Sequence, residues 1–187
     1  HRLDQVWAWA ISWDQAHAAQ VLTLMQKSFM KTGAPDALGY MMNLGYQQGV
    51  PVYMVQGMFC GTREAGLQAI APLLAIPSAQ LLVDKTGTYP DMNVWLEDHP
   101  YTLPDNLPDG IAETKASGYI NTRLSPADWQ RIIDYFKTSP NPWSLAYLEP
   151  YGGAINRYPV ADSAFVHRNV DADLVVDVFW RDPAERA

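Results

Sequence analysis

The chain has few of the residues that build disulfide frameworks and zinc sites. It contains one cysteine, Cys60, and four histidines. A single cysteine cannot close an internal disulfide, and no cysteine or histidine pair has the short spacing that holds a zinc ion. Cys60 ends an apolar stretch, so a buried small side chain and a reactive thiol both stay open as interpretations. The sequence therefore excludes the disulfide-rich and zinc-dependent classes.

Basic residues and long apolar runs are also scarce. Lysine and arginine number 13 against 20 aspartate and glutamate residues, which gives a net charge of -7. Nucleic-acid binding depends on clustered Lys and Arg, so we expect no nucleic-acid partner. No apolar run is long enough to cross a bilayer, so we expect no membrane span. Hydrophobic residues make up 48% of the sequence, which predicts one folded domain over residues 1–187.

The first half alternates between strand and helix patterns. Residues 5–13 alternate small and large side chains, a period of two that predicts a strand. Asp14 caps a predicted helix, and a second helix follows near 67–74, where Pro72 should kink it. Further strands are predicted at 38–46, 51–59 and 79–83. The order strand-helix-strand-strand-helix-strand is that of a ferredoxin-like unit.

The second half begins with an irregular stretch. Residues 86–117 are rich in Pro, Asp, Gly and Asn and predict a long loop, with one short helical turn near 90–96. Ser125, Pro126 and Asp128 then mark a helix start. Strands are predicted after this helix at 143–149, 152–157 and 172–180. The two halves together predict an α+β fold, an antiparallel sheet of about seven strands with helices on one face and the other face free.

The last predicted strand carries aspartates on one of its two faces. Asp171, Asp173 and Asp177 share that face with Val175 and Phe179, because alternate residues of a strand point the same way. The opposite face is apolar, and we expect it to meet the helices. Three carboxylates under a helix would be costly, so they should meet water, a cation or a polar cavity. In a closed cavity, burial would raise the pKa of such a carboxylate toward that of a general base.

Other polar residues lie on the same free face if the strands are in register. They are Asn43, Gln56, Tyr147 and Glu149. A buried amide needs a hydrogen-bond partner, which suits a binding site. A slip of one residue would invert each side chain, so core and solvent positions also stay open as interpretations.

Two dipeptides in the last third have structural and functional interpretations. Gly152-Gly153 permits a sharp turn or a close approach of the backbone to another surface. It lacks the lysine and the following helix of a phosphate-binding loop. His167-Arg168 suits anion binding, anchoring of a loop, or an ion pair with a nearby aspartate.

Several segments, taken in order, resemble one flavoprotein family. They are Gly57-Met-Phe-Cys-Gly61, Lys115-Ala-Ser-Gly-Tyr119, Glu149-Pro-Tyr-Gly-Gly153, Ala164-Phe-Val-His-Arg168 and Trp180-Arg-Asp-Pro183. This succession resembles the substrate domain of FAD-linked oxidases of the berberine-bridge-enzyme (BBE) type, within the vanillyl-alcohol-oxidase-like superfamily. The resemblance runs from end to end of the chain, and the Tyr-Gly-Gly and Ala-Phe-Val-His-Arg segments are its specific parts. Many members have proline where this chain has Val166.

The resemblance implies that the chain forms one wall of an enzyme. The free sheet face would cover the isoalloxazine ring of FAD, which a separate FAD-binding domain of the same parent protein would hold. The substrate would be an alcohol, a sugar or an alkaloid-like small molecule, and the isolated chain would be inactive. We expect the flavin module to precede this chain and the family's C-terminal segment to follow it, because neither is matched here.

The resemblance also suggests site residues. Family members often carry Gln, Asn or Glu at the position of Val175, so this valine would contact substrate without serving as a base. Asp173 and Asp177 flank it, and some members have an acid where Asp173 falls. We therefore expect catalysis from Asp173, then from Asp177. The predicted substrate-binding residues are Asn43, Gln56, Tyr147, Glu149 and Val175.

Two other hypotheses compete with the enzyme wall. One is a non-enzymatic α+β module that binds a ligand or dimerises through the free face, and a dimer face would be broadly apolar. The other is a hard-cation site built from Asp171, Asp173 and Asp177. An active-site wall would instead mix aromatic residues with a few polar groups, and Asp173 and Asp177 favour the enzyme wall.

Overall fold

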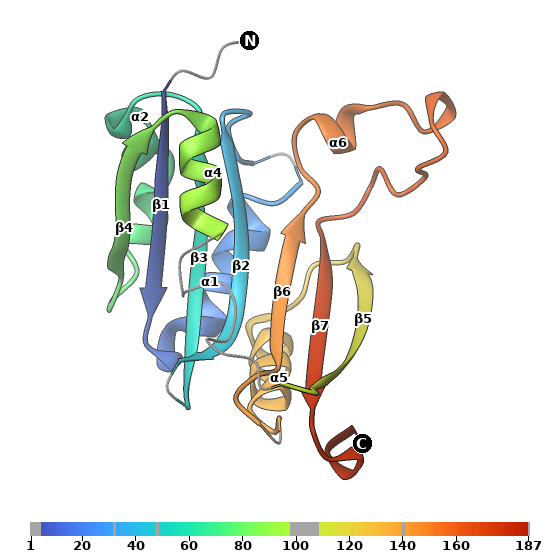
Figure 1. The fold of residues 1–187 in the computed structure, drawn as a ribbon. Helices are drawn as coiled ribbons and strands as arrows, with labels where there is room; N and C mark the ends of the chain where they lie inside the picture. The colour runs from blue at the N-terminus through green and yellow to red at the C-terminus, as the bar shows by residue number, and fades with distance from the viewer. Residues whose placement is uncertain (1–4, 32, 48, 98–108, 140, 187) are drawn as a thin grey trace.

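One antiparallel sheet organises the molecule (Figure 1). The computed structural model describes residues 5–31, 33–47, 49–97, 109–139 and 141–186. In these residues, seven strands are joined in the order β4-β1-β3-β2-β6-β7-β5. The strands are β1 (Val6–Trp13), β2 (Leu38–Gln47), β3 (Val50–Phe59), β4 (Gln80–Gly87), β5 (Ala112–Ile120), β6 (Leu145–Pro150) and β7 (Ala172–Trp180). The predicted α+β class and the antiparallel sheet are confirmed.

The helices lie mostly behind this sheet. They are α1 (Gln15–Ser28), α2 (Arg63–Ala69), α3 (Ala71–Leu74), α4 (Tyr89–Glu97), α5 (Pro126–Phe136) and α6 (Ala154–Arg157). Helices α1, α2, α3 and α5 cover the same face, as predicted. Helix α4 is the exception, because it lies on the other face over β1 and β4, where Met92 packs against Ala8 and Val83. No helix among the described residues is long and apolar enough to cross a membrane.

The first half is the predicted ferredoxin-like unit, with strands in the order β4-β1-β3-β2. Its centre is β1, whose two faces are both buried. Trp7, Trp9, Ile11 and Trp13 enter the core under the helices, while Val6, Ala8 and Ala10 face the side of α4. This division follows from the period of two that the sequence shows. A strand buried on both faces anchors the unit through its apolar area.

Helix α5 begins where the sequence predicts. The Ser125 side chain accepts a hydrogen bond from the backbone of Asp128, and the Asp128 carboxylate accepts one from the Ser125 backbone. This reciprocal cap satisfies two backbone N–H groups that a helix start leaves unpaired. Trp129 and Ile133 are fully buried, and α5 packs beside α1. The apolar stripe of α5 therefore closes the core under the second half of the sheet.

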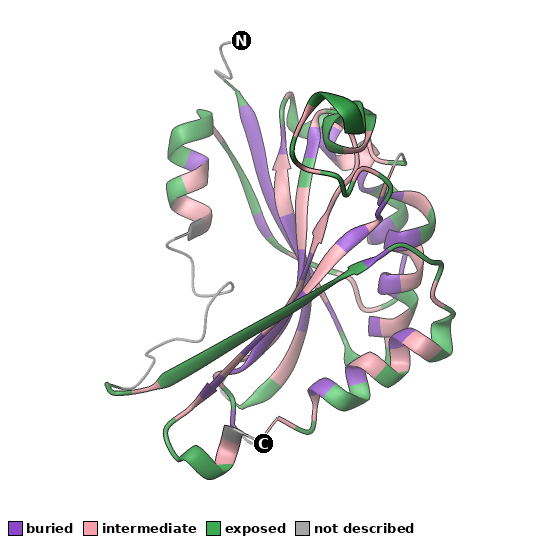
Figure 2. Cartoon of the chain, turned by 90° about the vertical axis from the view of Figure 1, so that its right-hand side faces the viewer, coloured by how far each residue is buried: buried purple, intermediate pink, exposed green. Residues whose placement is uncertain are grey.

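Two parts of the second half differ from the sequence prediction. The expected loop 86–117 contains the end of β4, the helix α4 and most of β5, and residues 98–108 lie outside the described part. The expected strand at 152–157 is instead α6, because Gly153 has φ 62 and turns the chain out of the sheet direction. Figure 2 shows β5 as a long exposed strand at the edge of the sheet. All of its residues except the last are exposed, so neither face of the strand needs apolar side chains, and its sequence shows no apolar alternation.

The two halves of the sheet meet over a short pairing. Strand β2 pairs with β6 only through Met42, Asn43 and Leu44. Behind this seam, the buried side chain of Gln26 on α1 connects the first half of the chain to the second half by hydrogen bonds. Its amide donates to the Thr122 carbonyl at 2.8 Å and to the Asp171 carboxylate at 2.8 Å, and it accepts from the Leu124 backbone at 2.9 Å.

Candidate functional site

The face of the sheet away from α1 and α5 carries three rows of side chains on β2, β6, β7 and β5. Directly opposed residues of an antiparallel pair lie on one face. The central row is Asn43, Tyr147, Val175 and Ser117. A second row is Glu149, Asp173 and Tyr119, and a third is Leu145, Asp177 and Lys115. We call these three rows the polar face.

The register therefore brings the predicted site residues together. Gln56 lies on the same side one strand further on, where β3 pairs it with Met41 of β2. Adjacent strands are about 4.8 Å apart, so the central row spans roughly 15 Å. The seven residues predicted from the sequence share this face, while their roles stay predictions.

Asp171 does not belong to the polar face, contrary to the sequence expectation. Its carboxylate accepts a hydrogen bond from Gln26, which lies on α1 behind the sheet. Asp171 precedes β7 at a bend, so the alternation of the strand does not extend to it. The hard-cation hypothesis needed Asp171 beside Asp173 and Asp177. Among the described residues, no group of three His, Cys, Asp or Glu side chains could hold a metal ion.

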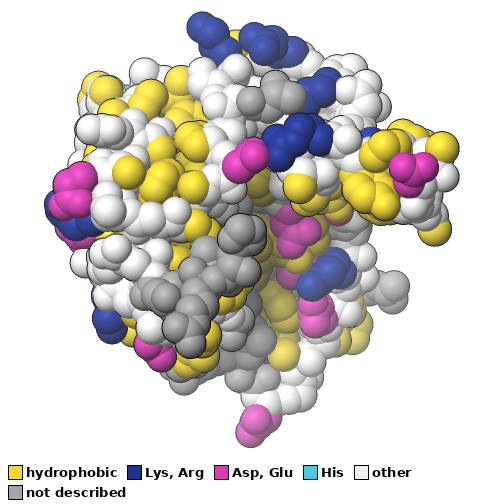
Figure 3. All heavy atoms as spheres, turned by 90° about the horizontal axis from the view of Figure 1, so that it is seen from above, with side chains coloured by type: hydrophobic (Ala, Val, Ile, Leu, Met, Phe, Trp, Pro, Cys, Tyr) yellow, Lys and Arg dark blue, Asp and Glu magenta, His cyan; other side chains and the backbone are white. Residues whose placement is uncertain are grey.

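The polar face is a hollow with a buried floor and an exposed rim. Gln56, Val175 and Asp177 are buried, Asp177 to 5% exposure. Lys115 and Ser117 of the edge strand β5 are exposed. Figure 3 shows acidic side chains and a basic one gathered in a hollow beside the projecting loop that follows β6. The sequence predicted the opposite burial for β7, whose helix-facing Leu174, Val176 and Val178 are only half-buried.

A lysine links the acid on the floor to a phenol in the central row. Lys115 Nζ lies 3.2 Å from Asp177 Oδ2 and 3.7 Å from Glu113 Oε1. Burial raises the pKa of Asp177, and the Lys115 ammonium opposes that shift. The hydrogen bond to Asp177 raises the pKa of Lys115, which stays protonated. Burial, together with the charge of Asp177, raises the pKa of Tyr147, so its hydroxyl stays a donor.

Three polar atoms of this face lack a hydrogen-bond partner among the described residues. They are Asn43 Nδ2, Asp173 Oδ1 and Asp177 Oδ1, and all three are buried. Unpaired buried polar atoms are unusual in folded proteins, because each costs free energy. One donor and two acceptors on a single face are a set that a hydroxylated small molecule can satisfy.

Aromatic rings form one end of the polar face. Tyr119 lies 5.5 Å from Tyr151 and 4.3 Å from His167 between ring centroids, and Phe165 lies 5.8 Å from Tyr151. Burial raises the pKa of Tyr151 to about 12, and a hydrogen bond with Tyr119 and the charge of Asp173 add to the shift. The rings therefore stand next to the second row and offer flat apolar surface beside its carboxylates.

The two dipeptides of the last third hold this end in place. A side chain at Gly152 would meet the Lys31 carbonyl oxygen at 2.8 Å, so only glycine permits this close approach. Arg168 donates to the Ile155 carbonyl at 3.0 Å and to Ser163 Oγ at 2.7 Å. Of the three interpretations of His167-Arg168, anchoring of the loop fits these contacts.

Sequence reasoning missed two residues of the site, Lys115 and Tyr119. Both lie on β5, whose residues 112–117 were predicted as part of a loop, and Tyr119 lies just beyond that predicted loop. The one signal for them was the segment Lys115-Ala-Ser-Gly-Tyr119, which belongs to the family resemblance. An edge strand exposed on both faces has no apolar period to reveal it.

Comparison with known proteins gives structural matches. Neither a family model nor a curated protein matches the sequence. A variant of BBE-like 1 from Physcomitrella patens matches 97% of this chain with TM-score 0.78 and 20% identity. BBE-like protein 28 from Arabidopsis thaliana matches 97% with TM-score 0.77 and 13% identity. This chain has the BBE-like fold.

The match includes an FAD-carrying oxidase. Glucooligosaccharide oxidase from Acremonium strictum, which carries a 6-S-cysteinyl, 8α-N1-histidyl FAD, matches 92% of this chain with TM-score 0.73 and 15% identity. The chain spans 40%, 38% and 38% of the length of these three proteins, in the order given. The resemblance read from the sequence is thus confirmed for the fold, which corresponds to one part of the larger BBE-like chains.

Proposed function

We propose that this chain is the substrate-side domain of an FAD-dependent oxidoreductase that oxidises an alcohol, a sugar or an alkaloid-like small molecule. The observation that carries the proposal is the polar face, a hollow where Asn43, Asp173 and Asp177 each have one buried polar atom without a partner among the described residues. The BBE-like fold and the FAD of the Acremonium oxidase support it. A dimerisation face would be broadly apolar, so the polar face does not favour the rival module.

The polar face fits the ring system and the substrate better than the phosphates of FAD. Val175, Ser117 and the aromatic rings offer flat surface, while Glu149, Asp173 and Asp177 would repel a pyrophosphate. We therefore assign the phosphates to an FAD-binding domain of the same parent protein. When bound, FAD would supply the acceptor for hydride from the substrate carbon.

Asp173 is the residue that we propose as proton acceptor. It is half-buried, and its Oδ1 has no partner among the described residues. Its neighbours across the strands are Glu149 and Tyr119. A substrate whose ring lies against Tyr119 could donate a hydroxyl hydrogen bond to Asp173. The Asp173 carboxylate would then take the hydroxyl proton as the carbon that bears the hydroxyl is oxidised.

Asp177 has a different proposed role, because it is buried and ion-paired. It holds the ammonium of Lys115 at 3.2 Å, and Lys115 in turn contacts Tyr147. We propose that Tyr147, kept protonated by its raised pKa, and the Asn43 amide donate to substrate oxygens and orient them. Gln56 and Glu149 complete the polar wall, and Val175 contacts the apolar part of the substrate.

The proposal is tested by anaerobic flavin reduction in the longer flavoprotein that contains this domain. Replacing Asp173 with asparagine should slow flavin reduction by about 10²–10⁴-fold, the usual contribution of a general base. Asp177→Asn should act mainly on KM, and Glu64→Gln, at an exposed position of α2, is the surface control. Flavin absorbance or alcohol oxidation by the purified 187-residue chain alone would show the proposal to be wrong.

A further inference from the structure

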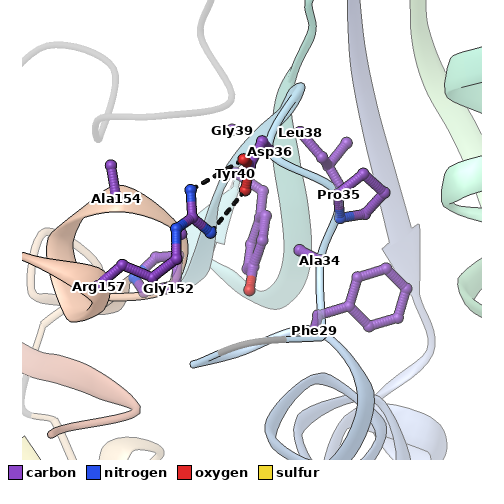
Figure 4. A pocket seen from close by; sticks show the side chains of 12 residues that line it. Phe29, Ala34, Pro35, Asp36, Leu38, Gly39, Tyr40, Gly152, Ala154 and Arg157 are labelled. Atoms are coloured by element: carbon purple, nitrogen blue, oxygen red, sulfur yellow. Dashed lines mark hydrogen bonds and ion pairs between the residues drawn. The ribbon is translucent and has the colours of Figure 1, made fainter.

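A second cavity lies between the two halves of the sheet, apart from the polar face. Its volume is about 340 Å³, within the range of small-molecule sites. Three segments line it: the end of α1 with the turn that follows, the start of β2, and the turn from β6 into α6. The side chains that define it are Phe29, Ala34, Leu38, Tyr40 and Arg157 (Figure 4).

The cavity follows from the short seam between β2 and β6. Pairing stops at Met42, so the start of β2 has no described strand beside it on that edge. On the opposite side of the cavity, the chain leaves β6 through two glycines. Gly152 lies too close to the Lys31 carbonyl for a side chain, and Gly153 has a positive φ of 62. The glycines turn the backbone away from β2 and hold α6 at a distance. The space is therefore fixed by backbone geometry.

Tyr40 supplies an unpaired hydrogen-bond donor inside this cavity. Its hydroxyl is buried and has no partner among the described residues. Figure 4 shows the hydroxyl pointing into the space between Phe29 and Gly152. The ring packs edge-on against Phe29 with centroids 6.2 Å apart, so it cannot swing away freely. Burial and the charge of Asp171 raise the pKa of Tyr40, so the hydroxyl keeps its proton.

The charges around the cavity select against anions. Arg157 closes the mouth by donating to Asp36 at 2.9 and 2.8 Å, so its charge is already matched. At the inner end, the charge of Asp171 acts on Tyr40 and would repel an anion. The remaining lining is apolar, including Phe29, Ala34, Pro35, Leu38, Pro150 and Ala154.

From these contacts we infer that the cavity beside Tyr40 binds a small uncharged molecule with an apolar ring and one oxygen acceptor. The ring lies against Phe29, Ala34 and Leu38, and the oxygen accepts the hydrogen bond of the Tyr40 hydroxyl. A buried donor that gains an acceptor recovers the free energy lost when it left water. This site is separate from the polar face, because Tyr40 packs with the core under the helices.

Acetophenone and ethylbenzene are matched probes, because the first has a carbonyl acceptor and the second does not. Each is titrated into the 187-residue chain and followed through backbone amide shifts by NMR. We expect acetophenone to bind about fivefold more tightly, the value of one ordinary hydrogen bond. Amides of Gly39 and Gly153 should shift, while those of Ile132 and Val176, in the apolar groove beside α5, should not.

Two variants and one control separate the site from unspecific binding. Tyr40→Phe should weaken acetophenone about fivefold and leave ethylbenzene unchanged, which removes the preference. Ala34→Leu should fill the cavity and abolish the binding of both. Tyr135→Phe, at the exposed ring of the other groove, should change neither. The inference is overturned by shifts around Ile132, by an unchanged preference in Tyr40→Phe, or by no shift with either probe up to its solubility.

Discussion

Replacing Gly66 with alanine sets helix propensity against packing. Gly66 lies inside α2, where alanine is favoured over glycine by about 1 kcal/mol. A Cβ at this position would overlap the Trp7 indole, coming within 2.8 Å of Cζ3. Trp7 cannot yield easily, because it is fully buried, stacked on Trp9, and bonded through Nε1 to Asp84 at 2.8 Å.

The cost of overpacking should therefore exceed the gain in helix propensity, and the variant should be less stable. Overpacking a well-filled core costs about 1–3 kcal/mol, and a rigid indole puts Gly66→Ala at the upper end. After the gain in propensity, we expect a net loss of about 2 kcal/mol. For a chain of this size, that loss lowers Tm by roughly 4–8 °C.

Thermal and urea unfolding, followed by circular dichroism, measure this loss. Gly118→Ala is the control, because a Cβ there meets no atom within 4 Å. It should leave stability unchanged or raise it slightly. A Gly66→Ala variant as stable as the parent would refute the reasoning, since it would mean that α2 or Trp7 moves without cost.

Further substitutions test individual contacts by urea unfolding. Gln26→Leu leaves the partners of this buried amide unpaired and should cost at least about 2 kcal/mol, so a loss below half of that would contradict its bridging role. Asp84→Leu removes the acceptor of the buried Trp7 N–H and should cost about 1–3 kcal/mol. Asp36→Leu, at an exposed ion pair, should change stability by less than about 1 kcal/mol, and equal effects at the two sites would disprove the distinction. Asp177→Asn tests pH dependence. Burial raises the pKa of Asp177, so the folded state holds its proton more tightly than the unfolded state. Wild-type stability from this group then falls as pH rises from about 4 through the folded pKa, and the variant should gain on the wild type over that range. A constant difference between pH 3 and 7 would be the contrary result.

The sequence predicts the elements whose side chains repeat. The alternation of β1 and the cap of α5 are local patterns, and the structure places both within one or two residues of the prediction. The polar face also follows from alternation, because Asp173, Val175 and Asp177 lie two residues apart on one strand. Register across strands then brings Asn43 and Tyr147 beside them.

The remaining parts depend on contacts that no local pattern shows. Strand β5 is exposed on both faces, so its composition is that of a loop and Lys115 was missed. Gln26 is a polar residue in an apolar helix stripe, and its role appears only when Thr122 and Asp171 are brought to it. The position of α4 on the other face is set by Met92 fitting over β1, which needs the tertiary structure.

The three-residue pairing of β2 with β6 determines where the two recesses lie. The two halves of the sheet are joined by three residue pairs between β2 and β6, and the pair of Asn43 and Tyr147 crosses this seam. The cavity beside Tyr40 lies at the same seam, on the face of the sheet that the helices cover. The hollow in front and the cavity behind therefore adjoin the same strand, β2, on opposite faces of the sheet.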